Sequence, residues 1–242
     1  MQYVFGIHPV LELLRSDPKK IERLWVAQDP DNSRLKGLAS EARRLGVTVH
    51  FEPKAGIQRR AGSEHHQGVV AAVAELKLLD EDQVLERCGP AALVLILDGI
   101  SDPHNLGAIL RTAEGAGVEG IFLPERRTSP VSPAAIKASA GAAHHLSIAR
   151  IGNVSYFLEK LRQNNFQVIG LDAAAPQLWT DVDLRRRVAL VFGSEGEGLR
   201  RLVKEHCDQL VRIPMAGRVQ SLNVSATAAV VLFEAVRQRS GT

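Results

Sequence analysis

Short apolar runs alternate with helical patterns after residue 90, and this alternation constrains the fold more than any other feature of the chain. The run Ala92–Leu97 contains no polar residue, which is typical of a parallel strand that is covered on both faces. Further strands are predicted at residues 120–123, 167–171 and 188–192, and helices at 105–116, 133–143, 155–163 and 222–237. Strands that alternate with helices predict an α/β fold with a mostly parallel sheet.

A change in composition at residues 76–90 divides the chain. This segment has four acidic and two basic residues and ends in Gly89-Pro90, which breaks regular structure, although its middle can form a short helix. Before it, strands and helices alternate on a smaller scale, at residues 3–5, 8–15, 21–27, 33–45, 47–51 and 68–73. A chain of 242 residues favours one large or two modest domains. We therefore predict a small α/β domain at residues 1–75, a linker at 76–90 and a larger α/β domain at 91–242.

Three segments place polar and glycine residues where an apolar strand ends or a helix begins. They are Asp98–Ala113, Leu190–Leu199 and Ile213–Thr227. Ligands of α/β sheets bind at the carboxyl ends of the strands. A helix start rich in Gly, Ser and Asn also leaves backbone N–H and C=O groups open to a ligand. We therefore expect the three segments to converge on one binding site.

In this order, the three segments resemble the three motifs of the SpoU branch of the SPOUT RNA methyltransferases. The matching patterns are Asp-Pro-x-Asn-x-Gly-x-x-x-Arg-Thr from Asp102, Gly-Ser-Glu-Gly-x-Gly from Gly193, and Ile-Pro-Met-x-Gly from Ile213 followed by Ser-Leu-Asn-Val-Ser. The resemblance covers residues 91–242. Residues 1–75 look like the small RNA-binding domain that is fused to many members, on Gly6-Ile-His-Pro-Val and His66-Gln-Gly-Val. The resemblance implies a deep trefoil knot at the C-terminal end, a rare feature that periodicity does not reveal.

The resemblance implies methyl transfer from S-adenosyl-L-methionine to a ribose 2′-hydroxyl of RNA. The enzyme must hold the acceptor oxygen, methyl carbon and sulfur in line, and such positioning can be worth an effective molarity of ~10⁵ M or more. The weakly acidic hydroxyl also needs a base, or a cation that shares its charge. The family's candidate is Arg111, which we expect to stabilise the alkoxide or bind phosphate because arginine stays charged. Glu195 is the alternative base or holds Arg111, and Asn105, Ser221 and Asn223 would orient the ribose and the loops.

By the family's pattern, backbone groups of the late loops bind the cofactor. These contacts centre on Gly193, Ile213 and Leu222, with Thr112, Gly198 and Met215 nearby. Main-chain groups can bind an adenine edge while apolar side chains sandwich its ring. The simpler alternatives are a tight strand-to-helix turn for the glycines, a surface ion pair for Arg111, and N-capping of the last helix for Ser221 and Asn223.

Residue spacing argues against other nucleotide sites and against a metal centre. The first apolar strand runs into Asp98-Gly-Ile-Ser-Asp102, which is not a Rossmann Gly-x-Gly-x-x-Gly. The run Gly193–Gly198 lacks the Lys and Ser/Thr of a phosphate-binding P-loop. No Cys pair or His-x-x-x-His has zinc spacing. Asp98 and Asp102 could hold a divalent cation, but Asp102-Pro103 fits a helix cap better, so we expect no metal.

Charge and cysteine content are compatible with an RNA-binding protein of a reducing compartment. The net charge is +3 with a pI near 9.0, and arginines cluster at residues 43–44, 59–60, 126–127, 185–187 and 200–201. These clusters could contact phosphates or form solvated surface, and His65 and His66 could donate to phosphate or form a turn. Cys88 and Cys207 are predicted to be free thiols. With no signal-peptide pattern and no long apolar run, we expect a cytoplasmic protein without a membrane span.

The last predicted helix is apolar in nearly every direction, which indicates that it is covered on all sides. One face can pack on its own sheet and the other can meet a second subunit. The resemblance likewise implies a homodimer through this region.

Within the family, the N-terminal domain, the motif matches and the chain length most resemble the members that methylate a guanosine of 23S ribosomal RNA in the peptidyl-transferase region. The alternatives are a transfer-RNA ribose methyltransferase of the same fold and, less favoured, a non-catalytic RNA-binding protein. The complete set of Asn105, Arg111, Glu195, Ser221 and Asn223 argues against the non-catalytic alternative.

Overall fold

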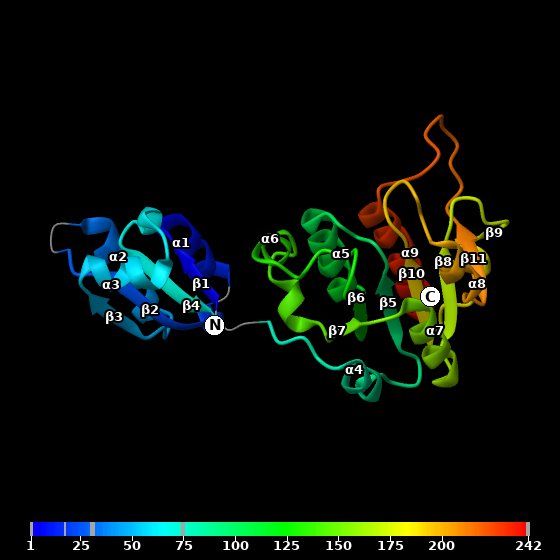
Figure 1. Cartoon of the computed structure of the whole chain (residues 1–242), viewed down its shortest axis with the longest axis horizontal. Coiled ribbons are helices and arrows are strands. Elements are labelled where there is room, and N and C mark those ends of the chain that lie inside the picture. The colour runs from blue at the N-terminus through cyan, green and yellow to red at the C-terminus, as the bar shows by residue number, and fades with distance from the viewer. Residues whose placement is uncertain (1, 17, 30–31, 74–75, 241–242) are drawn as a thin grey trace. The chain divides into compact units, whose positions relative to one another are not determined.

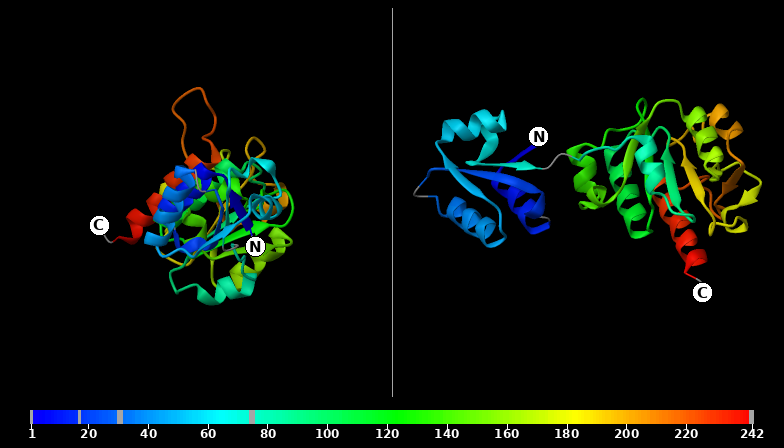
Figure 2. Two further views of the ribbon diagram at one scale, coloured as in Figure 1. Left: turned by 90° about the vertical axis from the view of Figure 1, so that its left-hand side faces the viewer. Right: turned by 90° about the horizontal axis from the view of Figure 1, so that it is seen from below.

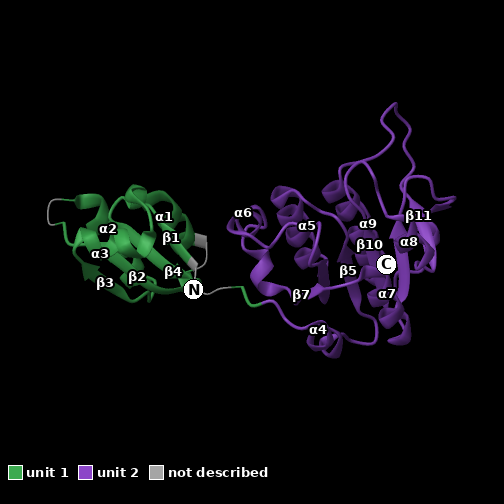
Figure 3. Ribbon diagram, in the orientation of Figure 1, with its two compact units in different colours: residues 1–77 green, residues 78–242 purple. Residues whose placement is uncertain are grey.

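A computed structural model of the chain describes residues 2–16, 18–29, 32–73 and 76–240. It contains two compact units, Met1–Lys77 (unit 1) and Leu78–Thr242 (unit 2), which are coloured green and purple in Figure 3. Each unit has its own sheet and its own buried apolar cluster.

Unit 1 is built on a four-stranded sheet in the order β1-β4-β2-β3. β4 is antiparallel to β1 and β2, and β2 is parallel to β3. The strands are β1 (Gln2–Phe5), β2 (Ile21–Ala27), β3 (Val49–Glu52) and β4 (Val69–Val73). Helices α1 (Ile7–Ser16) and α2 (Ser33–Arg44) cover one face and α3 (Lys54–Ala61) the other (Figure 2, right). Every residue of β4 is buried, because it is an inner strand covered on both faces.

The structure contains each predicted strand and helix of this region and adds α3. That helix was missed because its apolar periodicity is weak. Its large buried side chain is Ile57, and two arginines follow it. Gly62 ends α3 in the left-handed conformation, with φ +63°, as glycine commonly does at a helix C-terminus.

Unit 2 is built on a seven-stranded sheet in the order β7-β6-β5-β10-β8-β11-β9 (Figure 1). All six pairings are parallel, which confirms the predicted α/β class. The strands are β5 (Leu93–Leu97), β6 (Gly120–Pro124), β7 (Ile148–Ile151), β8 (Gln167–Leu171), β9 (Gln177–Leu178), β10 (Val188–Phe192) and β11 (Gln209–Arg212). Strands β7, β9 and β11 were not predicted, because they are short and carry polar residues among apolar ones. The threading of the chain through a knot stays a prediction.

Six helices cover the two faces of this sheet within the described residues. One face carries α5 (Pro103–Gly115), α6 (Pro133–Ala138) and α9 (Val224–Arg239), and the other α4 (Glu81–Arg87), α7 (Val154–Gln163) and α8 (Arg201–Glu205). The predicted helix at 133–143 ends earlier, because Ala140 and Gly141 have positive φ. The last helix begins at Val224 because Asn223 caps it.

The predicted linker contains α4, which belongs to the packing of unit 2. Asp80 forms a capping box with Gln83 at its start. Val84 and Leu85 are buried in the cluster that also contains Phe157. Residues 74–75, at the predicted boundary of the first domain, lie outside the described residues.

Candidate active site

A cavity of about 600 Å³ lies in unit 2 at the carboxyl ends of β8, β10 and β11. Its lining includes Leu171 at the end of β8, the loop Gly193–Gly198 after β10, and Ile213 just after β11. The segment before α9 closes it, and in Figure 1 the chain between β11 and α9 forms a long loop beyond the sheet. This is the edge of a parallel sheet where ligands bind, because the connecting loops leave it open.

Three polar side chains from the three sequence motifs meet beside this cavity. Asn105 Nδ2 donates to Glu195 Oε1 over 2.8 Å, and Asn223 Nδ2 donates to the same oxygen over 2.6 Å. Asn223 Nδ2 also lies 3.1 Å from Asn105 Oδ1. Glu195 and Asn223 line the cavity. The expected convergence of three distant segments is therefore present in the structure.

Asn223 has a second set of contacts at the start of α9. Its Oδ1 accepts from the backbone N–H of Ser225 over 2.8 Å and from the Ser225 hydroxyl over 2.6 Å. Asparagine is among the favoured N-cap residues because its side chain satisfies an N–H that the helix leaves open. One side chain thus caps α9 with its oxygen and holds Glu195 with its nitrogen.

The glycine-rich loop after β10 is a tight turn whose backbone requires glycine at three positions. Ser194 and Gly198 exchange backbone hydrogen bonds of 3.2 and 3.0 Å, and Gly196 and Gly198 have φ of +88° and +66°. A Cβ on Gly193 would overlap the backbone of Gly198. The loop therefore presents main-chain atoms to the cavity at close range.

An ion pair between a buried carboxylate and a half-exposed arginine anchors this loop to the first strand of the unit. Asp98, which follows β5 and is 4% exposed, accepts two hydrogen bonds of 2.9 Å from Arg200, just beyond the loop. Planar bidentate pairs of this kind fix geometry as well as charge. From the sequence, Arg200 was a possible phosphate contact and Asp98 a possible cation ligand, and neither pattern predicted that the two would pair.

A second pair, Asp172 with Lys204, lines the cavity and was also missed. Burial alone would raise the pKa of Asp172, but the Lys204 ammonium and the N–H of Ala174 hold that pKa below its ordinary value. The carboxylate is therefore charged at neutral pH. A usable signal was present, because Asp172 directly follows an apolar strand at its carboxyl end.

Most of the expected site residues line this cavity. They are Gly193, Glu195, Gly198, Ile213, Met215, Ser221, Leu222 and Asn223. Ser221 and Leu222 are exposed, whereas Ile213 and Met215 are half-buried. The lining thus combines backbone groups, apolar side chains and three carboxylates, Asp172, Glu195 and Glu197, with two cations, Lys204 and Arg212. Its apolar surface and small excess of negative charge suit a nucleoside that carries a positive charge.

Two expected residues lie elsewhere on α5. Arg111 is exposed, and the Thr112 hydroxyl donates to Ala108 O in its own helix over 3.0 Å. Neither is among the described residues that line the cavity. Asn105 and Arg111 are six residues apart, which places them about 120° apart around a helix. One face of α5 therefore meets Glu195 while Arg111 projects from another.

The last helix leaves part of its apolar surface uncovered in a single chain. Ala228, Val231 and Leu232 are buried, while Val230 is 37% and Phe233 54% exposed.

Of the helices that the structure describes, none combines the length and apolar character that crossing a membrane requires.

Each of the two units matches a family model of known proteins. The SpoU rRNA methylase family model matches residues 92–233, and a model for RNA 2′-O ribose methyltransferase substrate binding matches residues 3–79. The chain is 42% identical, over all of its length and 99% of the relative's, to the 23S rRNA (guanosine-2′-O-)-methyltransferase RlmB of Haemophilus influenzae. It is 38% identical to a Bacillus subtilis protein, YacO, over 98% of this chain and 96% of that one, whose TrmH family name leaves tRNA and rRNA open.

Among solved structures, an AdoMet-bound rRNA methyltransferase of Sinorhizobium meliloti superposes with a TM-score of 0.69. The two are 27% identical, and the alignment covers 97% of this chain and 86% of that one. With both units matched and a full-length relative above 40% identity, the chain belongs to the SpoU rRNA methylase family.

Proposed function

We propose that the protein transfers a methyl group from S-adenosyl-L-methionine to the ribose 2′-hydroxyl of a guanosine in 23S ribosomal RNA. The observation that carries this proposal is the hydrogen-bonded cluster of Asn105, Glu195 and Asn223 at a cavity lined by glycine backbone. Family membership supports the reaction, and the Haemophilus relative supports the target. Unit 1 would bind the RNA, residues 76–90 would link it to the catalytic domain, and residues 91–242 would form that domain.

The cavity fits the cofactor that the family uses. The backbone of Gly193 and Gly198 would bind polar edges of the adenosine, with Ile213, Met215 and Leu222 against its apolar surfaces. Asp172 and Lys204 line the same space as an ion pair, and with Glu195, Glu197 and Arg212 they leave the lining with an excess of one negative charge, which would attract the positive charges of the donor. When bound, the cofactor supplies an electrophilic methyl group.

The side-chain cluster would orient the acceptor. Glu195 Oε1 is occupied by two amide donors, so its carboxylate is fixed in direction and its other oxygen can accept from a ribose hydroxyl. Ser221, which lines the cavity beside it, adds a hydroxyl that can donate or accept. These residues place the sugar oxygen, and Arg111 supplies the cation that stabilises the alkoxide as the proton leaves.

Arg111 needs a second copy of the chain for this role. It is exposed on α5 and is not among the described residues that line the cavity, and α5 packs beside α9, which exposes Val230 and Phe233. A homodimer through α9 would cover these apolar side chains and bring α5 of one copy near the cavity of the other. We therefore propose a homodimer whose two sites each use Arg111 of the partner copy. Because its substrate is ribosomal RNA, we place the enzyme in the cytoplasm.

Methyl transfer with radiolabelled cofactor tests the activity and the target together. RNA from cells that lack the gene is separated into ribosomal and transfer RNA, and each is incubated with the full chain. We expect label in 23S ribosomal RNA, recovered after alkaline hydrolysis as resistant dinucleotides, because a methylated 2′-oxygen cannot assist strand cleavage. Label in transfer RNA alone would select the transfer-RNA enzyme, and absence of label from both would support the non-catalytic binder.

A further inference from the structure

The loop that follows β6 carries cationic side chains at the same edge of the sheet as the unit 2 cavity. It runs from residue 125 to residue 132, between β6 and α6. Arg126 and Arg127 are exposed on this loop, and at its base the half-buried Arg150 of β7 donates to Pro124 O over 2.8 Å. Glu125 is the one acidic residue of the loop, so the group has an excess of positive charge.

This loop lies next to the hydrogen-bonded cluster of the active site. Thr128 Oγ1 accepts from the backbone N–H of Gly99 over 3.1 Å. Gly99 in turn lies against the glycine loop, since a Cβ on it would lie 3.0 Å from Ser194, the neighbour of Glu195. β6 is also two strands from β10, which corresponds to roughly 10 Å. RNA that places a ribose at Glu195 would therefore pass close to this loop.

The backbone of the loop is held from two sides. Ser129 donates its backbone N–H to Ile100 O over 2.7 Å, and Glu125 donates its backbone N–H to Ile151 O over 2.9 Å. Thr128 and Ser129 are both buried. The two arginines between these anchors are therefore attached to a fixed backbone before any ligand binds.

The fold does not use the side chains of the two exposed arginines. Among the described residues, neither guanidinium has a hydrogen-bond or ion-pair partner. By contrast, the exposed Arg201 and Arg237 each pair with a glutamate of their own helix. An arginine without a partner keeps its five N–H donors for a ligand, and their planar fork matches the oxygens of a phosphate.

Arg127 also has a backbone conformation that is unfavourable for its residue type. Its φ is +67°, in the left-handed region that glycine adopts readily and that a bulky residue adopts rarely. Of the four non-glycine residues with positive φ in the described part of the chain, Arg127 is the charged one. Glycine would suit the turn better, so the arginine is explained by what its side chain binds.

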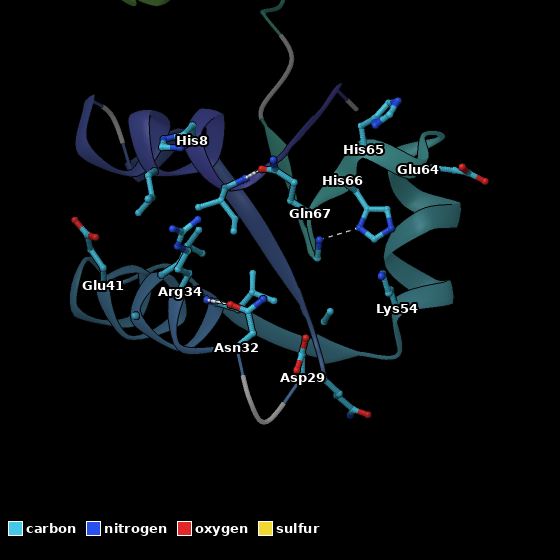
Figure 4. Close-up of a pocket in the computed structure, with 18 of the residues that line it drawn as sticks. His8, Asp29, Asn32, Arg34, Glu41, Lys54, Glu64, His65, His66 and Gln67 are labelled. Atoms are coloured by element: carbon cyan, nitrogen blue, oxygen red, sulfur yellow. Dashed lines mark hydrogen bonds between the residues drawn. The ribbon is translucent and has the colours of Figure 1, made fainter.

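A hollow of about 1020 Å³ in unit 1 does not offer the same charge (Figure 4). It lies between α1, α2 and the turn that leads into β4. The described residues that line it include equal numbers of cations and anions: Arg15, Arg34 and Lys54 against Asp29, Glu41 and Glu64. A groove for an RNA backbone carries an excess of positive charge, which the loop after β6 has and this hollow does not.

We propose that Arg126 and Arg127 bind phosphates of the RNA strand beside the nucleotide whose ribose is methylated. The proposal rests on the proposed function, since these phosphates belong to the RNA that the enzyme methylates. Phosphate contacts carry no base information, but they fix the register of the strand, and here they would determine which ribose reaches Glu195. Arg150 would add to the positive potential at the base of the loop.

Substitutions in the full chain test the side-chain charge and the backbone separately. Arg126→Gln and Arg127→Gln each remove one charge, Arg127→Lys keeps it, and Arg127→Gly removes the side chain while relieving the backbone. Arg87→Gln is the matched control, because Arg87 is an exposed arginine at the end of α4, which leads into β5 at the opposite edge of the sheet. Binding to 23S ribosomal RNA is measured at about 50 and 200 mM salt, with cofactor affinity and thermal unfolding alongside.

Each Gln variant should lose one phosphate contact, so the slope of log K against log salt concentration should become shallower by about 0.7–0.9. The loss of affinity should then be about threefold greater at the lower salt concentration than at the higher. Arg127→Lys should keep the original slope. Arg127→Gly should bind RNA like Arg127→Gln, yet unfold at an equal or higher temperature, because glycine adopts this φ without strain. Arg87→Gln should bind RNA normally, and cofactor affinity should not change in any variant.

Ethylation of the RNA phosphates, which removes their charge, locates the contacts along the strand. We expect ethylation within a few nucleotides of the methylated guanosine to block binding of the unchanged chain. One of these phosphates should become insensitive to ethylation in Arg127→Gln, because its partner is already absent.

Three results would overturn the proposal. They are salt slopes of both Gln variants equal to that of the unchanged chain, reduced stability of Arg127→Gly with unaltered RNA binding, and sensitive phosphates that all lie far from the methylated guanosine. Failure of the unchanged chain to methylate ribosomal RNA would overturn both this proposal and the proposed function. Methylation by the unchanged chain, with salt slopes that no variant alters, would overturn this proposal alone.

Discussion

The two hollows of this protein are built in opposite ways. The cavity of unit 2 is formed mainly by loops, with glycine main chain at close range and polar side chains that bond to one another. The hollow of unit 1 is lined by side chains on helices and by one turn, in which His66 accepts a hydrogen bond from the backbone N–H of Gly68. A site made of backbone leaves a sequence motif, because its glycines cannot be replaced. A site made of side chains can be altered one group at a time, so it can change specificity while the chemistry stays constant.

The largest effect is expected from substituting Arg111, the proposed catalytic cation, which does not line the unit 2 cavity. Arg111→Ala should lower kcat by about 10²- to 10³-fold, the usual effect of removing one charge-stabilising donor. Cofactor affinity by calorimetry should stay the same, since Arg111 is not among the described residues that line the cavity. Lost cofactor binding would show that Arg111 acts in the donor site. Mixing Arg111→Ala with a Gly193→Ala chain should restore part of the activity if each site uses both copies.

The backbone character of the unit 2 cavity predicts an effect from a single methyl group. Gly193→Ala should abolish measurable cofactor binding and cost about 1–3 kcal/mol of stability, because its Cβ would overlap the Gly198 backbone. Calorimetry and denaturant unfolding measure the two quantities. Gly217→Ala is the matched control in the loop between β11 and α9, where a Cβ has no atom within 4 Å. If both variants bind the cofactor equally, the close approach in this loop is not needed.

The anchor between β5 and the glycine loop should have a smaller effect. Asp98→Asn keeps the size of the side chain but removes the charge that Arg200 pairs with, and we expect a loss of about 1–3 kcal/mol in unfolding free energy. Because Arg200 positions the loop, KM for the cofactor should rise while kcat changes little. A normal KM together with reduced stability would show that the pair supports the fold alone.

The smallest effect concerns thiol reactivity, which reports on unit 2 alone. Both cysteines belong to unit 2. Burial raises the pKa of Cys207 to about 12, so at pH 8 almost no thiolate is present. We expect slow alkylation of Cys207 in the native protein, and rapid alkylation once unit 2 unfolds. Fast labelling under native conditions, followed by mass spectrometry of the modified peptide, would show that unit 2 opens locally.

The sequence predicted that Asn105, Glu195 and Asn223 would meet better than it predicted their surroundings. Asn105, Glu195 and Asn223 were identified because motifs preserve residue type and spacing, and they meet in the structure. The nearby cations Arg200 and Lys204 pair with residues 102 and 32 positions earlier, and charge alone does not say which partners will meet. Strand β11 and helix α3 were missed because short elements with mixed polarity have little periodicity.

The hollow of unit 1 shows the same limit of sequence-based prediction. His66 was noted as a possible phosphate donor or as part of a turn, and its sequence position gave no reason to separate these roles. What distinguishes it is a hydrogen bond to Gly68 that fixes which nitrogen carries the proton, together with leucines from another helix. Such an arrangement depends on tertiary packing and leaves no local pattern.

Asn223 both caps α9 and donates to Glu195, and these two roles limit which residues can replace it. Aspartate would cap α9 equally well, but it would set a second carboxylate against Glu195. Serine or threonine would also cap the helix, yet neither has a side-chain amide that could cap with its oxygen and donate to Glu195 with its nitrogen. Substitution at this position is therefore constrained both by the helix cap and by the contact with Glu195. Relatives that have lost the activity should carry Asp, Ser or Thr here, which caps the helix but does not donate to Glu195.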